Sequence, residues 1–150
     1  MPNWCIGTLR VRGTKENLTK FILEGLHPVT YFGQELQALE IDNYGCVECK
    51  RCWIKGTRRG FVTDLYECVA ELEDEGKTTI ALDAEFAWAI EPEKLLISCK
   101  EYGVDMRIYA FEQGVAFNQN IEIIDGKITK NEEITFDDYN WDCICPNIGG

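Results

Sequence analysis

The chain has a single histidine, His27, together with four prolines and two methionines among its 150 residues. A catalytic arrangement or metal site that needs two histidines is therefore excluded. No apolar run approaches the roughly 20 residues that a membrane-spanning helix requires. Met1-Pro2 leads straight into a strand pattern rather than into the charged and apolar regions of a signal peptide. The sequence therefore predicts a cytoplasmic protein without a membrane partner.

Positive charge is also scarce, because 15 Lys and Arg residues stand against 26 Asp and Glu residues and the net charge is −11. Residues 1–60 hold nine cationic residues against six acidic ones, whereas residues 61–150 hold six against twenty. A phosphate backbone repels so acidic a chain, so general nucleic-acid binding is disfavoured. Any such binding would have to use the basic first part of the chain.

An apolar content of 45% and four tryptophans predict a packed globule. The length suits one domain, residues 1–150, with a single core. Because thiols stay reduced in the cytoplasm, we expect core residues, metal ligands or reactive thiols rather than a disulfide framework. The expectation covers eight cysteines: Cys5, Cys46, Cys49, Cys52, Cys68, Cys99, Cys143 and Cys145.

Hydrophobic spacing predicts the elements of the first half. Alternation predicts a strand over residues 4–12, and helical spacing predicts a helix over residues 15–26. Residues 28–62 have no clean period and are interpreted as an inserted, Cys-rich excursion from the core. A second helix is predicted between an N-cap at Asp64 and a terminating glycine at Gly76.

The second half has clearer patterns. A strand covers residues 78–90 and places Phe86 and Trp88 in the core, and a helix follows from Pro92. Three further strand patterns follow at residues 104–111, 115–124 and 127–130. Residues 131–150 form an acidic tail. The order favours an α+β protein with a mainly antiparallel sheet and helices packed on one face.

The opening Pro2-Asn3-Trp4-Cys5, followed by Leu9, Val11 and Gly13 in strand register, resembles the N-terminal signature of the YubB/Api92-like family of phage- and plasmid-associated proteins. Looser likenesses follow at residues 53–58, 86–96 and 109–117. The resemblance implies a ferredoxin-like sandwich and an origin in a mobile element. It implies neither an iron–sulfur cluster nor a particular activity.

The cysteine-rich segment has the most distinctive chemical pattern. Cys46, Cys49 and Cys52 form C-x-x-C-x-x-C, a spacing at which two thiolates can bind one metal ion. Cys143 and Cys145 are candidates for the remaining ligands of a zinc site. The alternatives are a redox dithiol, an iron–sulfur cluster and, as the leading expectation, no cofactor.

Cations and aromatic residues cluster beside these cysteines. Such a mixture can bind single-stranded nucleic acid or a phosphate by charge and stacking. An ordinary solvated loop, and pairing with the acidic second half, are the alternatives. The candidate binding residues are Lys50, Arg51, Trp53, Lys55, Arg58 and Arg59.

The remaining polar residues do not favour catalysis. His27 precedes Pro28 at a predicted helix end, where a capping or surface role is typical. Asp83 and Glu85 share the polar face of a strand and form a candidate carboxylate pair, but solvated charges on an exposed sheet face are the preferred interpretation. Residues 56–60 lack the lysine of a phosphate-binding loop.

Two functional hypotheses follow. The first is a non-enzymatic accessory protein of a phage or mobile element that binds a host or phage protein, with acidic inhibition of a host defence factor as its sharper form. The second is a nucleic-acid-binding module that uses residues 46–61, with zinc as a candidate stabiliser. The sequence does not indicate an oligomeric state.

Overall fold

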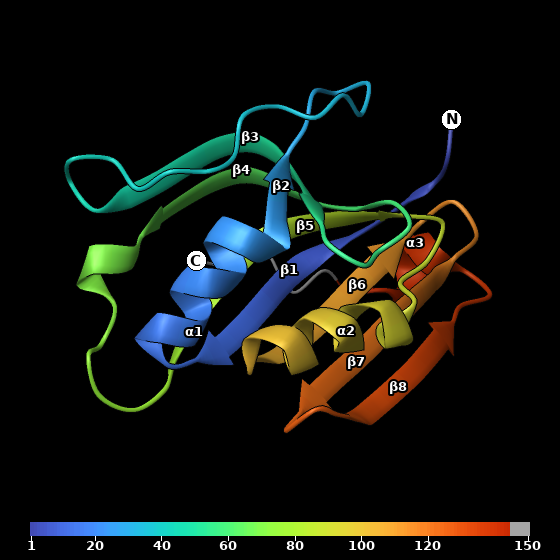
Figure 1. Cartoon of the computed structure of the whole chain (residues 1–150). Coiled ribbons are helices and arrows are strands. Elements are labelled where there is room, and N and C mark those ends of the chain that lie inside the picture. The colour runs from blue at the N-terminus through green and yellow to red at the C-terminus, as the bar shows by residue number, and fades with distance from the viewer. Residues whose placement is uncertain (145–150) are drawn as a thin grey trace.

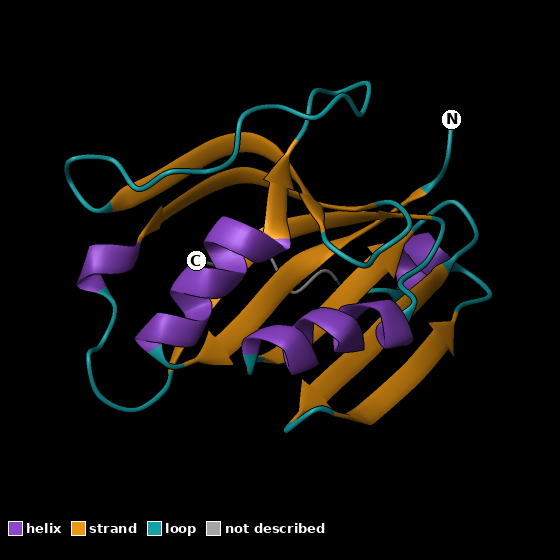
Figure 2. Cartoon of the chain, viewed as in Figure 1, coloured by secondary structure: helices purple, strands orange, loops and turns teal. Residues whose placement is uncertain are grey.

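A computed structural model describes residues 1–144, which form an α+β protein (Figure 1). Its strands are β1 (Trp4–Gly13), β2 (Leu26–Pro28), β3 (Cys46–Ile54), β4 (Gly60–Cys68), β5 (Thr78–Ala87), β6 (Asp105–Glu112), β7 (Phe117–Ile124) and β8 (Lys127–Thr135). The helical elements are α1 (Lys15–Lys20), the π turn η1 (Phe21–Gly25), the 3-10 turn η2 (Val69–Glu71), α2 (Pro92–Tyr102) and α3 (Tyr139–Asp142) (Figure 2). None of these helices is long and apolar enough to cross a membrane.

One antiparallel sheet contains all eight strands of the described residues, in the order β2-β3-β4-β5-β1-β6-β7-β8. The central strand β1 pairs with β5 on one side and with β6 on the other. The chain passes from β5 to β6 through α2. In Figure 1, α1 and α2 lie on the same side of the sheet.

The third helix lies against the opposite face. Gln119 of β7 hydrogen-bonds the backbone of Ile90, just before α2. Its neighbour Asn118 accepts a hydrogen bond from the Tyr139 hydroxyl of α3 at 2.6 Å. Because successive side chains of a strand leave opposite faces, α2 and α3 lie on different faces. The sequence predicted helices on one face alone.

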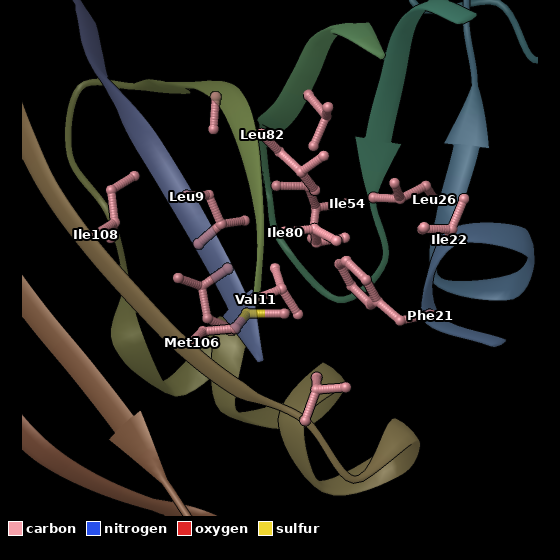
Figure 3. Close-up of a cluster of buried hydrophobic side chains, with 14 of the residues drawn as sticks. Leu9, Val11, Phe21, Ile22, Leu26, Ile54, Ile80, Leu82, Met106 and Ile108 are labelled. Carbon is pink, nitrogen blue, oxygen red and sulfur yellow. The ribbon is translucent and has the colours of Figure 1, made fainter. Parts of the chain in front are cut away.

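The apolar core fills the space between the sheet and the α1, η1 and α2 segments (Figure 3). Its side chains come from the alternate residues of each strand that face inward, and from the apolar face of the helical segment around Phe21. Full burial of each large apolar side chain contributes roughly 1.5–3 kcal/mol. Members labelled in Figure 3 are Leu9, Val11, Phe21, Ile22, Leu26, Ile54, Ile80, Leu82, Met106 and Ile108.

The helix predicted between Asp64 and Gly76 is wrong. The chain instead continues as β4 to Cys68 and then makes the single turn η2. Asp64 has a positive φ of 48°, and the strand changes face there. Val62 and Leu65, three residues apart, therefore both face the core. The apolar stripe that predicted the helix, Leu65, Cys68, Val69 and Leu72, instead spans the end of β4 and the turn η2, and a strand end followed by one turn imitates a helical period.

The excursion predicted over residues 28–62 is wrong in part, because residues 29–45 form no named helix or strand but strands occupy much of the remainder. Residues 46–54 form β3, which pairs with β2 and β4 inside the sheet. The predicted tail is ordered at its start, since residues 131–135 complete β8 and α3 follows. Its last part, residues 145–150, lies outside the described residues.

The locally coded elements are confirmed. β1, β5 and α2 occupy the predicted segments, and Gly103 ends α2 with a φ of 65°. Asp125 and Gly126 join β7 to β8 with φ values of 51° and 69°. Two consecutive positive φ values are those of a type I′ hairpin turn.

Candidate functional site

The candidate binding residues converge on the tight connection between β3 and β4, residues 55–59. Buried Thr57 fixes this connection through its hydroxyl, which donates to the Ile54 carbonyl at 2.6 Å and accepts from the Gly60 N–H at 3.1 Å. The Trp53 indole N–H donates to the Thr57 carbonyl at 3.0 Å. One hydroxyl thus closes the turn from within.

Helix α2 fixes the same connection from outside. The Ser98 hydroxyl donates to the Lys55 carbonyl at 3.0 Å. Gly56 has a φ of 90°, and a Cβ there would lie 3.3 Å from a carbonyl of α2, so the loop and helix are in close contact. The connection is therefore rigid, and it presents Arg58 and Arg59 to solvent.

A hollow of about 530 Å³ lies between this connection and residues 29–35. We call it the basic groove. Glu35 is the acidic residue among its described lining residues. The lining residues that matter for binding are Tyr31, Arg51, Trp53, Arg58, Arg59 and Phe61.

Arg51 lies among aromatic rings beside the groove. Its guanidinium carbon is 4.0 Å from the ring centroid of Phe61, 5.3 Å from that of Tyr31 and 5.5 Å from that of Trp4. Its Nη1 also lies 2.6 Å from Oε1 of Glu85. The charge of Arg51 is thus balanced inside the protein, and its cation–π contacts hold the rings in place.

Arg58 and Arg59 differ from Arg51 because neither forms an ion pair within residues 1–144. Both side chains are exposed. The guanidinium carbon of Arg59 lies 5.8 Å from the Trp4 ring centroid. Two cations that have no counter-ion among the described residues therefore stand beside a cluster of aromatic rings, where they can bind an external anion.

The two predicted lysines lie outside the groove. Lys50 Nζ is 2.6 Å from Asp64, and Lys55 Nζ is 2.9 Å from Glu101 of α2. Hydrogen bonds to these carboxylates raise the pKa of both lysines. Four of the six predicted binding residues, Arg51, Trp53, Arg58 and Arg59, are therefore brought together by the fold.

The expectation of reduced cysteines is wrong for one pair. Cys46 and Cys68 lie directly opposite each other on β3 and β4, with Cα atoms 3.9 Å apart, and form a disulfide. A sequence separation of 22 residues hides this pairing, which the β3–β4 register creates. The bond removes Cys46 from the predicted set of zinc ligands.

The other predicted metal ligands are also dispersed. Cys49 and Cys52 face the core side of β3, and burial, with the neighbouring Cys49 thiol, raises the pKa of Cys52. Cys143 accepts a hydrogen bond from Asn118 near α3, and Cys145 lies outside the described residues. Across residues 1–144, no three His, Cys, Asp or Glu side chains gather as metal ligands.

The candidate catalytic residues have structural partners. His27 Nε2 lies 3.1 Å from the Glu24 carbonyl, and its ring packs 5.5 Å from that of Trp53. Glu85 is paired with Arg51, so it is not free to act with Asp83. These contacts favour structural roles for His27 and Glu85.

Three aromatic residues near these arginines were not predicted from the sequence as binding residues. In the sequence, Trp4 stood out only as part of the opening motif, yet its ring lies against Arg59 and Phe61. Tyr31 lies in a segment without a period. Trp88, expected in the core, is 57% exposed. The consecutive aromatic residues Tyr31 and Phe32 were the one sequence signal for this part of the site. Aromatic side chains that are exposed together indicate a binding surface rather than core packing.

The chain matches no family model, no curated protein and no solved structure. The geometry itself shows what the site can do. Unpaired guanidinium groups can bind phosphate oxygens through two parallel hydrogen bonds. Aromatic faces beside them can stack on planar groups. The site is thus suited to a ligand that alternates anionic and aromatic parts.

Proposed function

We propose that the protein is a non-enzymatic binding protein that holds a single strand of nucleic acid in the basic groove. The observation that carries the proposal is the position of Arg58 and Arg59 beside Tyr31 and Phe32, which are 73% and 92% exposed. Proteins that bind single strands combine cations along the phosphate backbone with aromatic rings on which bases stack. The groove contains both.

The acidic net charge does not oppose this proposal, because the charges are separated in space. The exposed carboxylates of residues 71–75 follow the far end of the β3–β4 hairpin. Eight residue steps along a strand place that end about 26 Å from the groove. Screening at physiological ionic strength acts over about 8 Å. The carboxylates of residues 71–75 are therefore screened from a ligand in the groove, which lies beside Arg58, Arg59 and the lining carboxylate Glu35.

The sheet topology supports the expected ferredoxin-like fold and, with it, the resemblance to the YubB/Api92-like family. The central strands run β4-β5-β1-β6, and helices follow β1 and β5. A β-α-β-β-α-β unit has this order of elements. In this proposal β2, β3, β7 and β8 extend the unit. A mobile-element origin and a cytoplasmic location, where nucleic acid is accessible, belong to the same proposal.

A protein partner is the second candidate, favoured by the acidic connection between β4 and β5. Glu71, Glu73, Asp74 and Glu75 are all exposed there, and Lys15 pairs with Asp74. Such a surface fits a basic protein, including a host defence factor that itself binds nucleic acid. In this case binding would depend on residues 71–75 and would be independent of the groove.

Fluorescence anisotropy with a labelled single strand of about 12 nucleotides tests the first proposal. The variant R58E/R59E reverses both groove cations, and K100E/K127E applies the same charge change at exposed lysines elsewhere. For two lost phosphate contacts, the slope of log K against log salt should decrease by about 1.4. Equal weakening by both variants, or no binding by the wild-type protein, would refute the proposal.

A further inference from the structure

A second hollow lies on the other side of the β3–β4 connection. It has a volume of about 200 Å³ and lies between residues 57–60 and residues 86–94. We call it the Trp88 pocket. Arg58 and Arg59 line both this pocket and the basic groove, so the two hollows meet at these side chains.

The backbone of Trp88 is held in an unusual conformation. Its φ is 71°, a region that bulky side chains rarely occupy. The Trp88 N–H donates to the Asn3 carbonyl at 2.8 Å, and the N–H of Ala87 donates to the Arg59 carbonyl at 3.0 Å. These bonds keep the indole at the pocket wall and 57% exposed. Strained residues of this kind concentrate at ligand-binding sites.

The charge of the pocket favours an anion. Arg58, Arg59 and Lys94 line it, and none of them is ion-paired within the described part of the chain. Glu91 is the acidic residue of the described lining. Three cations therefore face one carboxylate beside an accessible indole face, and the excess charge is positive.

The size of the pocket limits its ligand. Sites that enclose a whole small molecule have volumes of about 300–1,000 Å³, so a hollow of about 200 Å³ suits one unit of a longer chain. We propose that it binds one nucleotide of the strand in the basic groove, with the base stacked on Trp88 and a phosphate at Arg58, Arg59 and Lys94. This inference rests on the proposed function.

Variants of the residues that belong to the pocket alone test it. Trp88→Gly removes the indole and suits the positive φ, so the variant should fold, which circular dichroism verifies. Lys94→Gln removes one cation. The matched controls are Trp141→Gly, at a tryptophan that is 84% exposed on α3, and Lys100→Gln on α2. Stacking contributes enough for Trp88→Gly to weaken single-strand binding about tenfold or more.

The outcomes separate the pocket from the groove. Weakening by W88G and K94Q but not by W141G and K100Q supports the pocket, as does photocross-linking of a bromouracil-containing strand to Trp88. If the wild-type protein binds through Arg58 and Arg59 while W88G and K94Q bind equally well, the pocket inference is overturned and the groove remains. If neither single-stranded DNA nor RNA binds the wild-type protein, both proposals fail.

Discussion

Replacement of Thr57 by valine should destabilise the protein although the two side chains have the same shape. The Thr57 hydroxyl donates to the Ile54 carbonyl and accepts from the Gly60 N–H, and the residue is buried. Valine can do neither, so the variant leaves the Gly60 N–H without its side-chain acceptor. An unsatisfied buried donor costs about 2 kcal/mol.

The loss is measured by urea unfolding. With a denaturant slope of about 2 kcal/mol/M, the midpoint should decrease by about 1 M. Thr57→Ser keeps the hydroxyl and should retain most of the stability. Thr19→Val is the control for a less critical hydroxyl, because Thr19 is only partly buried and its contact with the Lys15 carbonyl lies within the single helix α1. Its cost should stay within about 0.5 kcal/mol.

The same substitution links stability to binding. Thr57 closes the turn that holds Arg58 and Arg59, so a loosened turn should weaken binding of a single strand even where the protein is folded. An unchanged urea midpoint for Thr57→Val would refute the reasoning about the hydroxyl. A lower midpoint with unchanged affinity would show that the turn does not position the arginines.

The remaining predictions concern a covalent bond and a carboxyl group. The Cys46–Cys68 disulfide closes a loop of 22 residues, so the free energy of unfolding of C46S/C68S should be about 3 kcal/mol lower than that of the oxidised protein. A reductant should lower the melting temperature of the wild-type protein but not that of the C46S/C68S variant. Burial by itself would raise the pKa of Asp105, but hydrogen bonds from the Asp125 N–H and Arg12 outweigh it and lower this pKa. The resulting stability is present above the ordinary value of about 3.9 and is lost as the pH falls through the folded-state pKa. Between neutral and acidic pH, the melting temperature of Asp105→Asn should therefore decrease less than that of the wild-type protein. Identical pH profiles for the two proteins would contradict this assignment.

Local sequence patterns predicted the helices, strands and turns whose hydrogen bonds or buried faces are set by residues close together in the chain. Alternation identified β1 and β5, Pro92 and Gly103 marked the ends of α2, and Asp125-Gly126 identified a hairpin turn. The same reasoning was wrong between Asp64 and Gly76. The apolar residues from Leu65 to Leu72 lie on the end of β4 and around the turn η2, and in sequence alone a strand end followed by one turn cannot be distinguished from a helical period.

The binding site was predictable in part. The run from Arg51 to Arg59 identified the cations and one indole, because a tight turn keeps sequence neighbours close. It did not separate the free arginines from the paired lysines. Lys55 meets Glu101, 46 residues away, and this contact depends on the packing of α2 against the β3–β4 connection.

The amino-acid sequence by itself determined the α+β class, the charge separation along the chain and the segment that carries the binding arginines. These properties depend on composition and on residues close together in the chain. The tertiary structure decided which arginines are free, which cysteines meet and which aromatic rings surround the site. Trp4, Tyr31 and Arg51 are far apart in the sequence. They meet because Tyr31 follows β2, and β2, β3, β4, β5 and β1 lie side by side in one sheet. The pairing of strands sets the distances between such residues, and this pairing cannot be inferred from the local periodicity of the sequence.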